Sequence, residues 1–145
     1  PYVNSYRRLA RHTAAPINIE WGYDNRTVGI RSPISSPQAR RIENRVIGSD
    51  ANPYVAMAMT LACGYLGLKN KLKAKPEMKG DGYLSPYALP RSLGEALDWL
   101  RRDDDLREIL GEEFITVYTE IKEIEFEEFM EVISPWEREH LLLHV

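Results

Sequence analysis

The chain has 145 residues, enough for one ordinary domain with a hydrophobic core. Hydrophobic residues make up 43% and charged residues 28% of it, with a net charge of -3, which is typical of a globular protein in water. The single cysteine excludes an intrachain disulfide framework, and no apolar run is long enough to span a bilayer. We therefore expect a cytoplasmic protein with no membrane partner. Because the sequence does not begin with Met, we also expect a piece of a longer protein.

The charge is distributed unevenly. Residues 1–45 carry eight Arg, no Lys and three acids, whereas the remainder carries eleven basic residues and nineteen acids. Guanidinium groups bind carboxylate and phosphate oxygens through a planar fork, so this composition favours an anion site. The alternative is an ordinary basic surface, in which Lys would be mixed with Arg. The acidic remainder, the pI near 5.7 and the absence of a known binding module argue against nucleic acid.

Three strands are predicted in the first third of the chain. Residues 17–23 alternate between two faces, with Ile17, Ile19, Trp21 and Tyr23 on one and Asn18 and Glu20 on the other, as in a half-buried strand. The stretch 24–26, DNR, indicates a turn, because Asp and Asn can bond their own backbone. Residues 27–33 then form a second strand in a hairpin with the first, and residues 39–47, ARRIENRVI, form a third.

The rest of the chain is predicted to be helical. Asn52 caps a helix of about twenty residues that begins at Pro53. That helix is apolar on nearly every side, so we expect it to be buried with Cys63 as a core residue. Residues 74–91 form a long loop.

Four shorter patterns follow that loop. Ser92 and Glu95 indicate a capping box for a helix to about residue 102, and residues 103–105 cap a short helix that ends near Gly111. A helix over residues 112–132 should bury Phe114, Val117, Tyr118, Ile121 and Ile124. Ser134, Pro135 and Glu137 open the last helix. The predicted fold class is α+β, with short antiparallel strands in the N-terminal third and helices in the C-terminal two-thirds.

The stretch RRIENR, residues 40–45, is the strongest candidate site. In a strand, Arg41, Glu43 and Arg45 share one face. The two guanidiniums should keep the carboxylate ionised, and an ionised carboxylate can bind a hard cation such as magnesium or manganese. The alternative is a surface ladder of charges that contributes little to stability.

Other arginines strengthen the site interpretation. Arg26 and Arg31 flank the predicted second strand, and Arg7 and Arg8 lie near the N-terminus. So many guanidiniums on a small sheet would repel one another unless anions lie between them. Spacing alone leaves the surface ladder and the anion site both open.

Four motifs in order resemble the glutamine synthetase family: NSYRRL, APINIEWGYDNRTVGIRSP, ARRIENR and DANPYVAMAMTLACGYLGL, within residues 4–68. Members of that family are about three times this length, so residues 1–145 resemble the C-terminal part of its catalytic domain. Residues 1–48 would then form strands and one wall of the active site, and residues 49–145 the helical part. Within the family, the motifs WGYDNRT and ARRIENR more closely resemble those of the γ-glutamylputrescine and γ-glutamylpolyamine synthetases.

The resemblance implies a reaction and residue roles. ATP phosphorylates the side-chain carboxylate of glutamate, and ammonia or an amine then displaces the phosphate. Glu43 would bind the metal, magnesium or manganese, nearest the ATP phosphates. Arg8 and Arg45 would hold glutamate, Arg26 the transferring phosphate, and Arg31 and Arg41 the nucleotide phosphates.

One position departs from the family pattern. Glutamine synthetases carry a glutamate just before the AP pair, in a loop that closes the site, and Ala14 stands at that position here. A small residue leaves room for an alkyl amine, so we expect a primary amine in place of ammonia.

The resemblance leaves two alternatives open and carries one further expectation. The alternatives are a glutamine synthetase that uses ammonia and a non-catalytic assembly member of the family. Family members form homo-oligomeric rings, and the apolar ending HLLLHV suits either a contact in such a ring or packing within its own subunit.

Overall fold

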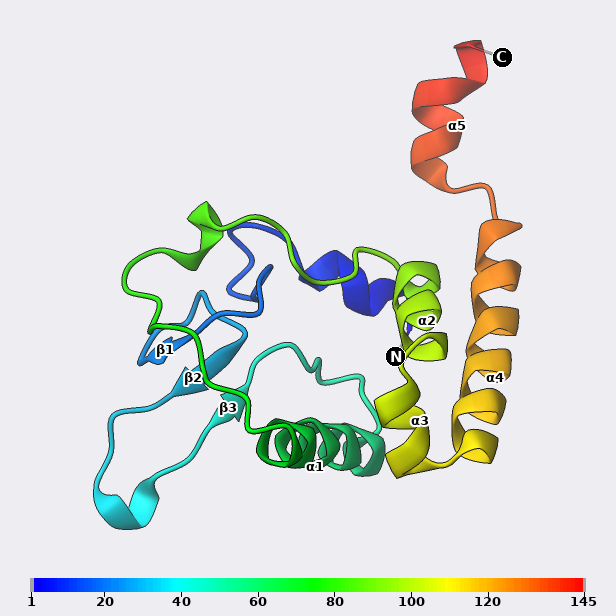
Figure 1. The fold of residues 1–145 in the computed structure, drawn as a ribbon. Coiled ribbons are helices and arrows are strands. Elements are labelled where there is room, and N and C mark those ends of the chain that lie inside the picture. Colours follow the sequence, from blue (N-terminus) through cyan, green and yellow to red (C-terminus); the bar gives the residue numbers. More distant parts are fainter. Residues whose placement is uncertain (1, 145) are drawn as a thin grey trace.

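The computed structural model describes residues 2–144 and places strands before helices along the chain (Figure 1). The N-terminal part holds the 3₁₀ helix η1 (Val3–Arg8), the strands β1 (Trp21–Tyr23), β2 (Ile30–Ser32) and β3 (Glu43–Asn44), and the 3₁₀ turn η2 (Pro37–Ala39). The helices are α1 (Pro53–Lys69), α2 (Leu93–Arg101), α3 (Asp104–Leu110), α4 (Glu112–Met130) and α5 (Pro135–Leu141), with 3₁₀ turns η3 (Gly82–Leu84) and η4 (Leu142–His144). The predicted α+β class is confirmed.

The strands form one mixed sheet in the order β1-β2-β3. Strands β2 and β3 are antiparallel, and Arg31 lies opposite Glu43. Strands β1 and β2 are parallel, with Gly22 opposite Arg31, so the predicted hairpin is wrong. Asn25 Oδ1 accepts the backbone N–H of Thr27 at 3.0 Å, which makes the expected turn. The chain reverses again before β2, and neither the turn residues nor the alternation predicts that second reversal.

The alternation over residues 17–23 is also only partly realised. Ile17 is fully buried, but Ile19 is 57% exposed and Asn18 is only 1% exposed. Asn18 Nδ2 donates to the carbonyls of Thr27 at 3.1 Å and Gly82 at 2.9 Å. Its Oδ1 accepts the backbone N–H of residue 20 at 3.1 Å. The alternation therefore does not hold before residue 21, where β1 begins: Ile19 of the expected apolar face is exposed, and Asn18 of the expected polar face is buried as a fully bonded amide.

Helix α1 begins as predicted but is not buried. Asn52 Oδ1 accepts the N–H of Tyr54 at 3.0 Å, which confirms the cap. Ala62 is its only buried residue, Leu61 is 70% exposed, and Cys63 is exposed, so the core placement of the cysteine is wrong. Helix α3 packs on α1, and Asn44 of β3 donates a hydrogen bond to Thr60 of α1. A cavity of about 730 Å³ lies along α1, with lining residues that include Tyr6, Val55, Met59 and Tyr118.

Helices α2 and α4 pack side by side through a small core. A side-chain carbon at Gly94 of α2 would lie 2.9 Å from the ring of Phe126 in α4, so the glycine permits close approach. The buried face of α4 carries Ile115, Thr119 and Lys122. Most of the predicted stripe is exposed instead, with Ile121 and Ile124 more than half exposed, whereas Tyr118 is half-buried. Two of the three buried residues of α4 are thus polar, and helix α2 packs against this helix.

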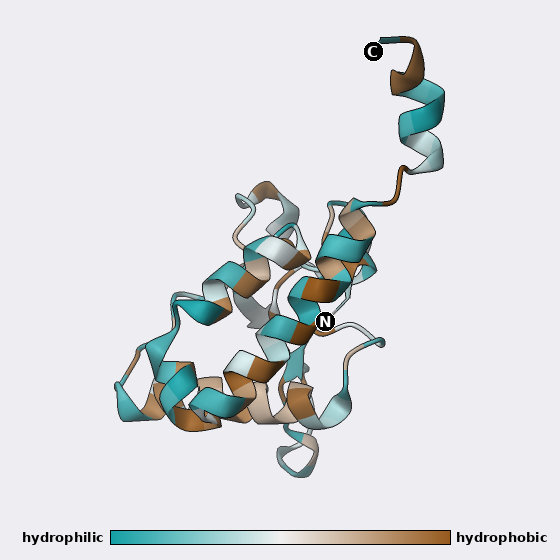
Figure 2. Cartoon of the chain, turned by 90° about the vertical axis from the view of Figure 1, so that its right-hand side faces the viewer, coloured by the Kyte–Doolittle hydropathy of each residue, from teal (hydrophilic) through white to brown (hydrophobic). Residues whose placement is uncertain are grey.

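Helix α5 stands away from the rest of the chain (Figures 1 and 2). Its predicted capping box is present, since Ser134 Oγ accepts the N–H of Glu137 and the Glu137 carboxylate accepts the N–H of Ser134. Leu143, in the C-terminal stretch that was expected to form a contact, is 91% exposed. Val145, the last residue of that stretch, lies outside the described residues. No helix within residues 2–144 combines the length and the apolar character needed to cross a bilayer.

Candidate functional site

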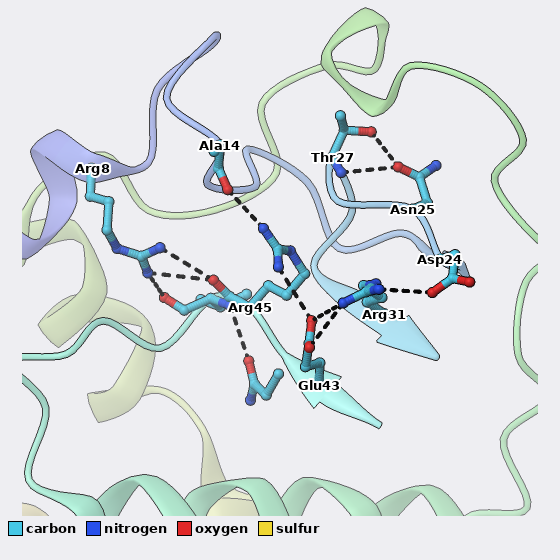
Figure 3. A network of polar contacts seen from close by, with 10 residues as sticks. Arg8, Ala14, Asp24, Asn25, Thr27, Arg31, Glu43 and Arg45 are labelled. Atoms are coloured by element: carbon cyan, nitrogen blue, oxygen red, sulfur yellow. Dashed lines mark hydrogen bonds and ion pairs between the residues drawn. The ribbon is translucent and has the colours of Figure 1, made fainter. Parts of the chain in front are cut away.

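The antiparallel register of β2 and β3 builds the centre of the site. It places Arg31 opposite Glu43, and Arg31 Nη1 donates to both carboxylate oxygens of Glu43, at 3.0 and 3.2 Å. The other terminal nitrogen of Arg31 binds Asp24 Oδ1 at 2.8 Å (Figure 3). One guanidinium therefore bridges two carboxylates, which is the fork geometry that arginine suits and lysine does not.

Arg45 approaches the same carboxylate from the other side. Its Nη1 lies 3.3 Å from Glu43 Oε2, and its Nη2 donates to the backbone carbonyl of Ala14 at 2.8 Å (Figure 3). The predicted sharing of a face by Glu43 and Arg45 is thus observed. Asn44, between them, points the other way and donates to Thr60 of α1 at 3.2 Å. Because successive side chains of a strand point to opposite faces, Asn44 attaches β3 to α1 while Glu43 faces the network.

Arg8 reaches the network from η1. Its guanidinium donates to the backbone carbonyl of Arg45 at 3.3 Å and to that of Val46 (Figure 3). Ser5, one turn earlier, donates its hydroxyl to Asp50 beyond β3, and this bond lowers the pKa of the Asp50 carboxyl. Helix η1 is therefore tied to the chain after β3 at two points, which holds Arg8 beside Arg45.

The network keeps its carboxylate charged. The hydrogen bonds from Arg31, and then from Arg45, lower the pKa of Glu43 below that of an ordinary glutamate, although partial burial opposes them. The Nε atoms of Arg8, Arg31 and Arg45 are all buried, and none of the described residues accepts a hydrogen bond from them. Three guanidinium groups with unused buried donors fit an anionic group at this place.

Two predicted site residues lie outside this network. Arg41 precedes β3, is exposed, and donates to its near neighbour Ala39 at 3.2 Å. Arg26 lies in the turn before β2, is exposed, and forms no hydrogen bond or ion pair with any residue between 2 and 144. Arg41 forms no hydrogen bond or ion pair with Glu43 among residues 2–144, so the predicted grouping of Arg41 with Glu43 and Arg45 is not observed. The phosphate-binding roles of Arg26 and Arg41 stay predictions.

The described residues supply little of a metal site. No group of three or more His, Cys, Asp or Glu side chains that could hold a metal ion occurs within residues 2–144. Glu43 offers the two oxygens of one carboxylate as ligands. The carboxylate of Asp24 is connected to it only through Arg31. A divalent cation needs more oxygen ligands than this. The donor chemistry of Glu43 fits one position in a cation site.

Sequence reasoning missed the contacts that hold the loop 10–15. Its residues His12 and Ala14 have φ values of 65° and 58°, which is the left-handed region that costs a residue with a side chain about 1 kcal/mol. The loop is held from both sides, by Arg45 on the Ala14 carbonyl and by the Tyr83 hydroxyl on the Ala15 carbonyl at 3.1 Å. Backbone carbonyls carry no sequence signal, so these contacts could not be predicted.

A comparison with known families identifies the class of protein. Residues 1–141 match the family described as glutamine synthetase, catalytic domain. The chain therefore belongs to the glutamine synthetase catalytic-domain family, which confirms the resemblance carried by the four motifs.

Individual relatives include both amine ligases and glutamine synthetases. The chain is 39% identical to the glutamate–isopropylamine ligase of a Pseudomonas species, covering 94% of this chain and 31% of that protein. It is 40% identical to type-1 glutamine synthetase 2 of Dictyostelium discoideum, covering 98% and 28%, and 40% identical to the γ-glutamylputrescine synthetase PuuA of Escherichia coli K12, covering 98% and 30%. The chain spans less than a third of the length of these relatives.

A solved structure supports the fold assignment. The complex of GmaS with ADP superposes with a TM-score of 0.85 at 29% identity, covering 98% of this chain and 34% of that one. The mixed sheet and the helices after it are thus a known arrangement of this family.

Proposed function

We propose that this chain is part of an ATP-dependent ligase that joins the side-chain carboxylate of glutamate to a primary amine. The observation that carries the proposal is the carboxylate of Glu43 held between Arg31 and Arg45, with Arg8 beside them. Glutamate, nucleotide and acyl phosphate are all anionic, and clustered guanidiniums with unused buried donors suit them. Family membership supplies the reaction type, and the names of two relatives support an amine as acceptor.

The bound groups supply the chemistry that the chain lacks. ATP, when bound, supplies the phosphoryl group, and magnesium or manganese balances its charge, with Glu43 as one ligand. Arg8 and Arg45 hold the glutamate so that its side-chain carboxylate faces the phosphoryl group. Arg26 binds the transferring phosphate, while Arg31 and Arg41 bind the nucleotide phosphates, which places positive charge where charge spreads in the transition state. The bond to the leaving ADP breaks as the γ-glutamyl phosphate forms.

The second half of the reaction depends on space near the loop 10–15. The neutral amine nitrogen attacks the acyl carbon, phosphate leaves with the bonding electrons, and the nitrogen loses a proton. Ala14 offers only a methyl group, and its carbonyl is already bound by Arg45. This small side chain leaves room for an alkyl group on the attacking nitrogen and supplies no carboxylate to attract ammonium. An acceptor larger than ammonia is therefore favoured.

Glutamine synthesis from ammonia is the second candidate, because type-1 glutamine synthetase 2 matches at the same identity as PuuA. The chain alone should be inactive, since Glu43 can be only one ligand of a metal site. A third candidate is a non-catalytic assembly member, and the exposed end around Leu143 suits a contact between subunits in a homo-oligomeric ring. The retained Arg31, Glu43 and Arg45 network favours catalysis over a purely structural role.

One experiment separates these candidates. The full-length protein is incubated with glutamate, ATP, magnesium and either ammonium or one of several primary amines, and phosphate release and amide formation are measured. We expect γ-glutamyl amide from at least one amine with a kcat/KM at least about tenfold above that for ammonium. A preference for ammonium would instead support glutamine synthesis. Binding of ADP without formation of any product would support the assembly role.

A further inference from the structure

The segment 75–82, part of the long loop between α1 and α2, lies along β1. Met78 donates its backbone N–H to the Trp21 carbonyl at 2.9 Å, and Trp21 Nε1 donates to the Lys75 carbonyl at 2.6 Å. A side-chain carbon at Gly22 would lie 2.8 Å from the Met78 carbonyl oxygen, so the two backbones approach closely. The segment 75–82 is therefore fixed on the strand that leads into the turn 24–27.

Asn25 joins that turn to the segment 75–82. Its Oδ1 accepts the backbone N–H of Thr27 at 3.0 Å and the Thr27 hydroxyl at 2.7 Å (Figure 3). Its Nδ2 donates to the carbonyls of Met78 at 3.2 Å and Gly80 at 2.9 Å, so every donor and acceptor position of the amide is used. The Thr27 hydroxyl oxygen in turn accepts the backbone N–H of Gly82 at 2.7 Å. A change in the shape of the turn would break these bonds.

The two neighbours of Asn25 in the sequence carry charge. Asp24, before it, has a φ of 44°, which is disfavoured for a residue with a side chain, and its carboxylate binds Arg31 at 2.8 Å. Arg31 in turn binds Glu43 at 3.0 Å, and its Nε is a buried donor that no described residue uses. Arg26, after Asn25, is exposed. The turn that Asn25 holds therefore sets both the anchor of Arg31 and the point from which Arg26 projects.

We propose that Asn25 is a positioning residue that places Arg26 and Arg31 for phosphate binding. The inference rests on the proposed function, in which these two arginines bind the transferring phosphate and the nucleotide phosphates. It goes beyond that function by assigning a role to a neutral side chain whose hydrogen bonds are all made within the chain. Arg8 and Arg45, which hold glutamate in the proposed function, are fixed by other carbonyls, so Asn25 acts on the phosphate side alone.

The test compares the two substrates in the full-length protein, with whichever amine or ammonium the wild type accepts. The values of kcat, the KM for ATP and the KM for glutamate are measured for the wild type and Asn25→Ala. We expect the KM for ATP to rise about tenfold and kcat to fall about tenfold, while the KM for glutamate stays within about twofold. A loss of folded protein alone would lower the apparent kcat and leave both KM values unchanged.

A second pair of variants changes the turn without removing the amide. Thr27→Val keeps the shape of the side chain but removes the hydroxyl that joins Asn25 to Gly82, and it should raise the KM for ATP about threefold. Thr27→Ser restores the hydroxyl and should restore the KM. Asn18→Ala is the structural control, because Asn18 also binds the Thr27 and Gly82 carbonyls but makes no bond to Asn25. It should lower the melting temperature and leave both KM values unchanged.

The outcomes separate the inference from the function on which it rests. In an active ligase, KM values that are both unchanged or both raised equally in Asn25→Ala would overturn the positioning role and leave the function standing. The same selective rise in Asn18→Ala would also overturn it, since any weakening of the contact with the segment 75–82 would then suffice. Failure of the wild type to form an amide from any amine or from ammonium would overturn both.

Discussion

Arg45 donates one hydrogen bond to the backbone carbonyl of Ala14, at 2.8 Å, while its other terminal nitrogen pairs with Glu43. One guanidinium thus joins the central carboxylate of the site to the loop at which the acceptor would arrive. The loop has two residues in the left-handed region, so it depends on such contacts to keep its shape. A change at Arg45 should therefore affect both the loop and catalysis.

Arg45→Lys should loosen the loop 10–15, because an ammonium group cannot bridge two acceptors in the fork geometry of a guanidinium. Hydrogen exchange of a peptide spanning residues 9–17 should become about tenfold faster, and kcat/KM should fall about 100-fold. Arg40→Lys, at an exposed position three residues before β3, is the control and should change neither quantity. Unchanged exchange in Arg45→Lys would show that the carbonyl contact does not hold the loop.

Asn18 should be important for stability although it lies on the face expected to be polar. Its amide is 1% exposed and satisfies the carbonyls of Thr27 and Gly82 and one backbone N–H. Asn18→Ala leaves three buried backbone groups without partners and should cost about 3 kcal/mol in unfolding free energy, measured by urea denaturation. Asn70→Ala, at an exposed helix end, should cost less than about 1 kcal/mol. Equal costs would contradict the structural role assigned to Asn18.

Lys122 should hold η1 to α4 through its charge. It is 8% exposed, lies 4.0 Å from the ring centre of Tyr2, and binds both carboxylate oxygens of Glu125 at 2.8 Å. Lys122→Met keeps the volume but removes the charge, so we expect a loss of about 1 kcal/mol in unfolding free energy. In Tyr2→Leu the same substitution should cost measurably less, because the cation–π contact is already gone. Additive effects in this double-mutant cycle would exclude that contact as a source of stability.

Glu43 should make stability depend on acid pH. Its pKa is lowered in the folded protein, first by Arg31 and then by Arg45. Its contribution is therefore complete above the unfolded pKa of about 4.3 and is lost as the pH falls through the lower folded-state value. The difference in melting temperature between the wild type and Glu43→Gln should be constant from pH 7 to 5 and should shrink below about pH 4. Asp50, whose pKa is also lowered, titrates in both proteins and cancels in the difference.

The local features of the fold could be predicted from the sequence, because they depend on neighbouring residues. Asn52 and Ser134 cap α1 and α5 as expected, since an N-cap needs only a side-chain oxygen and the next turn of helix. The direction of β1 relative to β2 could not be predicted, because it depends on the path of the whole segment between them. The buried face of α4 was mispredicted for a related reason: the burial of Ile115, Thr119 and Lys122 depends on where the neighbouring elements lie, which spacing along the helix does not give.

For the candidate site, too, only the features that depend on neighbouring residues could be predicted from the sequence. The alternation of Glu43 and Arg45 along one strand face is a local property, and the structure contains it. The contact of Arg31 with Glu43 depends on strand register, which spacing alone does not give. Asp24 was expected to bond its own backbone in the turn, but its carboxylate binds Arg31 instead. Arg41 lies outside the network because its guanidinium donates instead to the carbonyl of its near neighbour Ala39.

The central claim is that the carboxylate of Glu43 binds metal for phosphoryl transfer. The most direct test measures glutamate-dependent ADP formation by full-length Glu43→Gln across a range of magnesium and manganese concentrations. Glutamine keeps the size of the side chain and an acceptor for Arg31 and Arg45, so the fold should be retained. We predict a loss of at least about 1,000-fold in rate at every metal concentration, with a circular dichroism spectrum like that of the wild type. A rate within about tenfold of the wild type would contradict the claim.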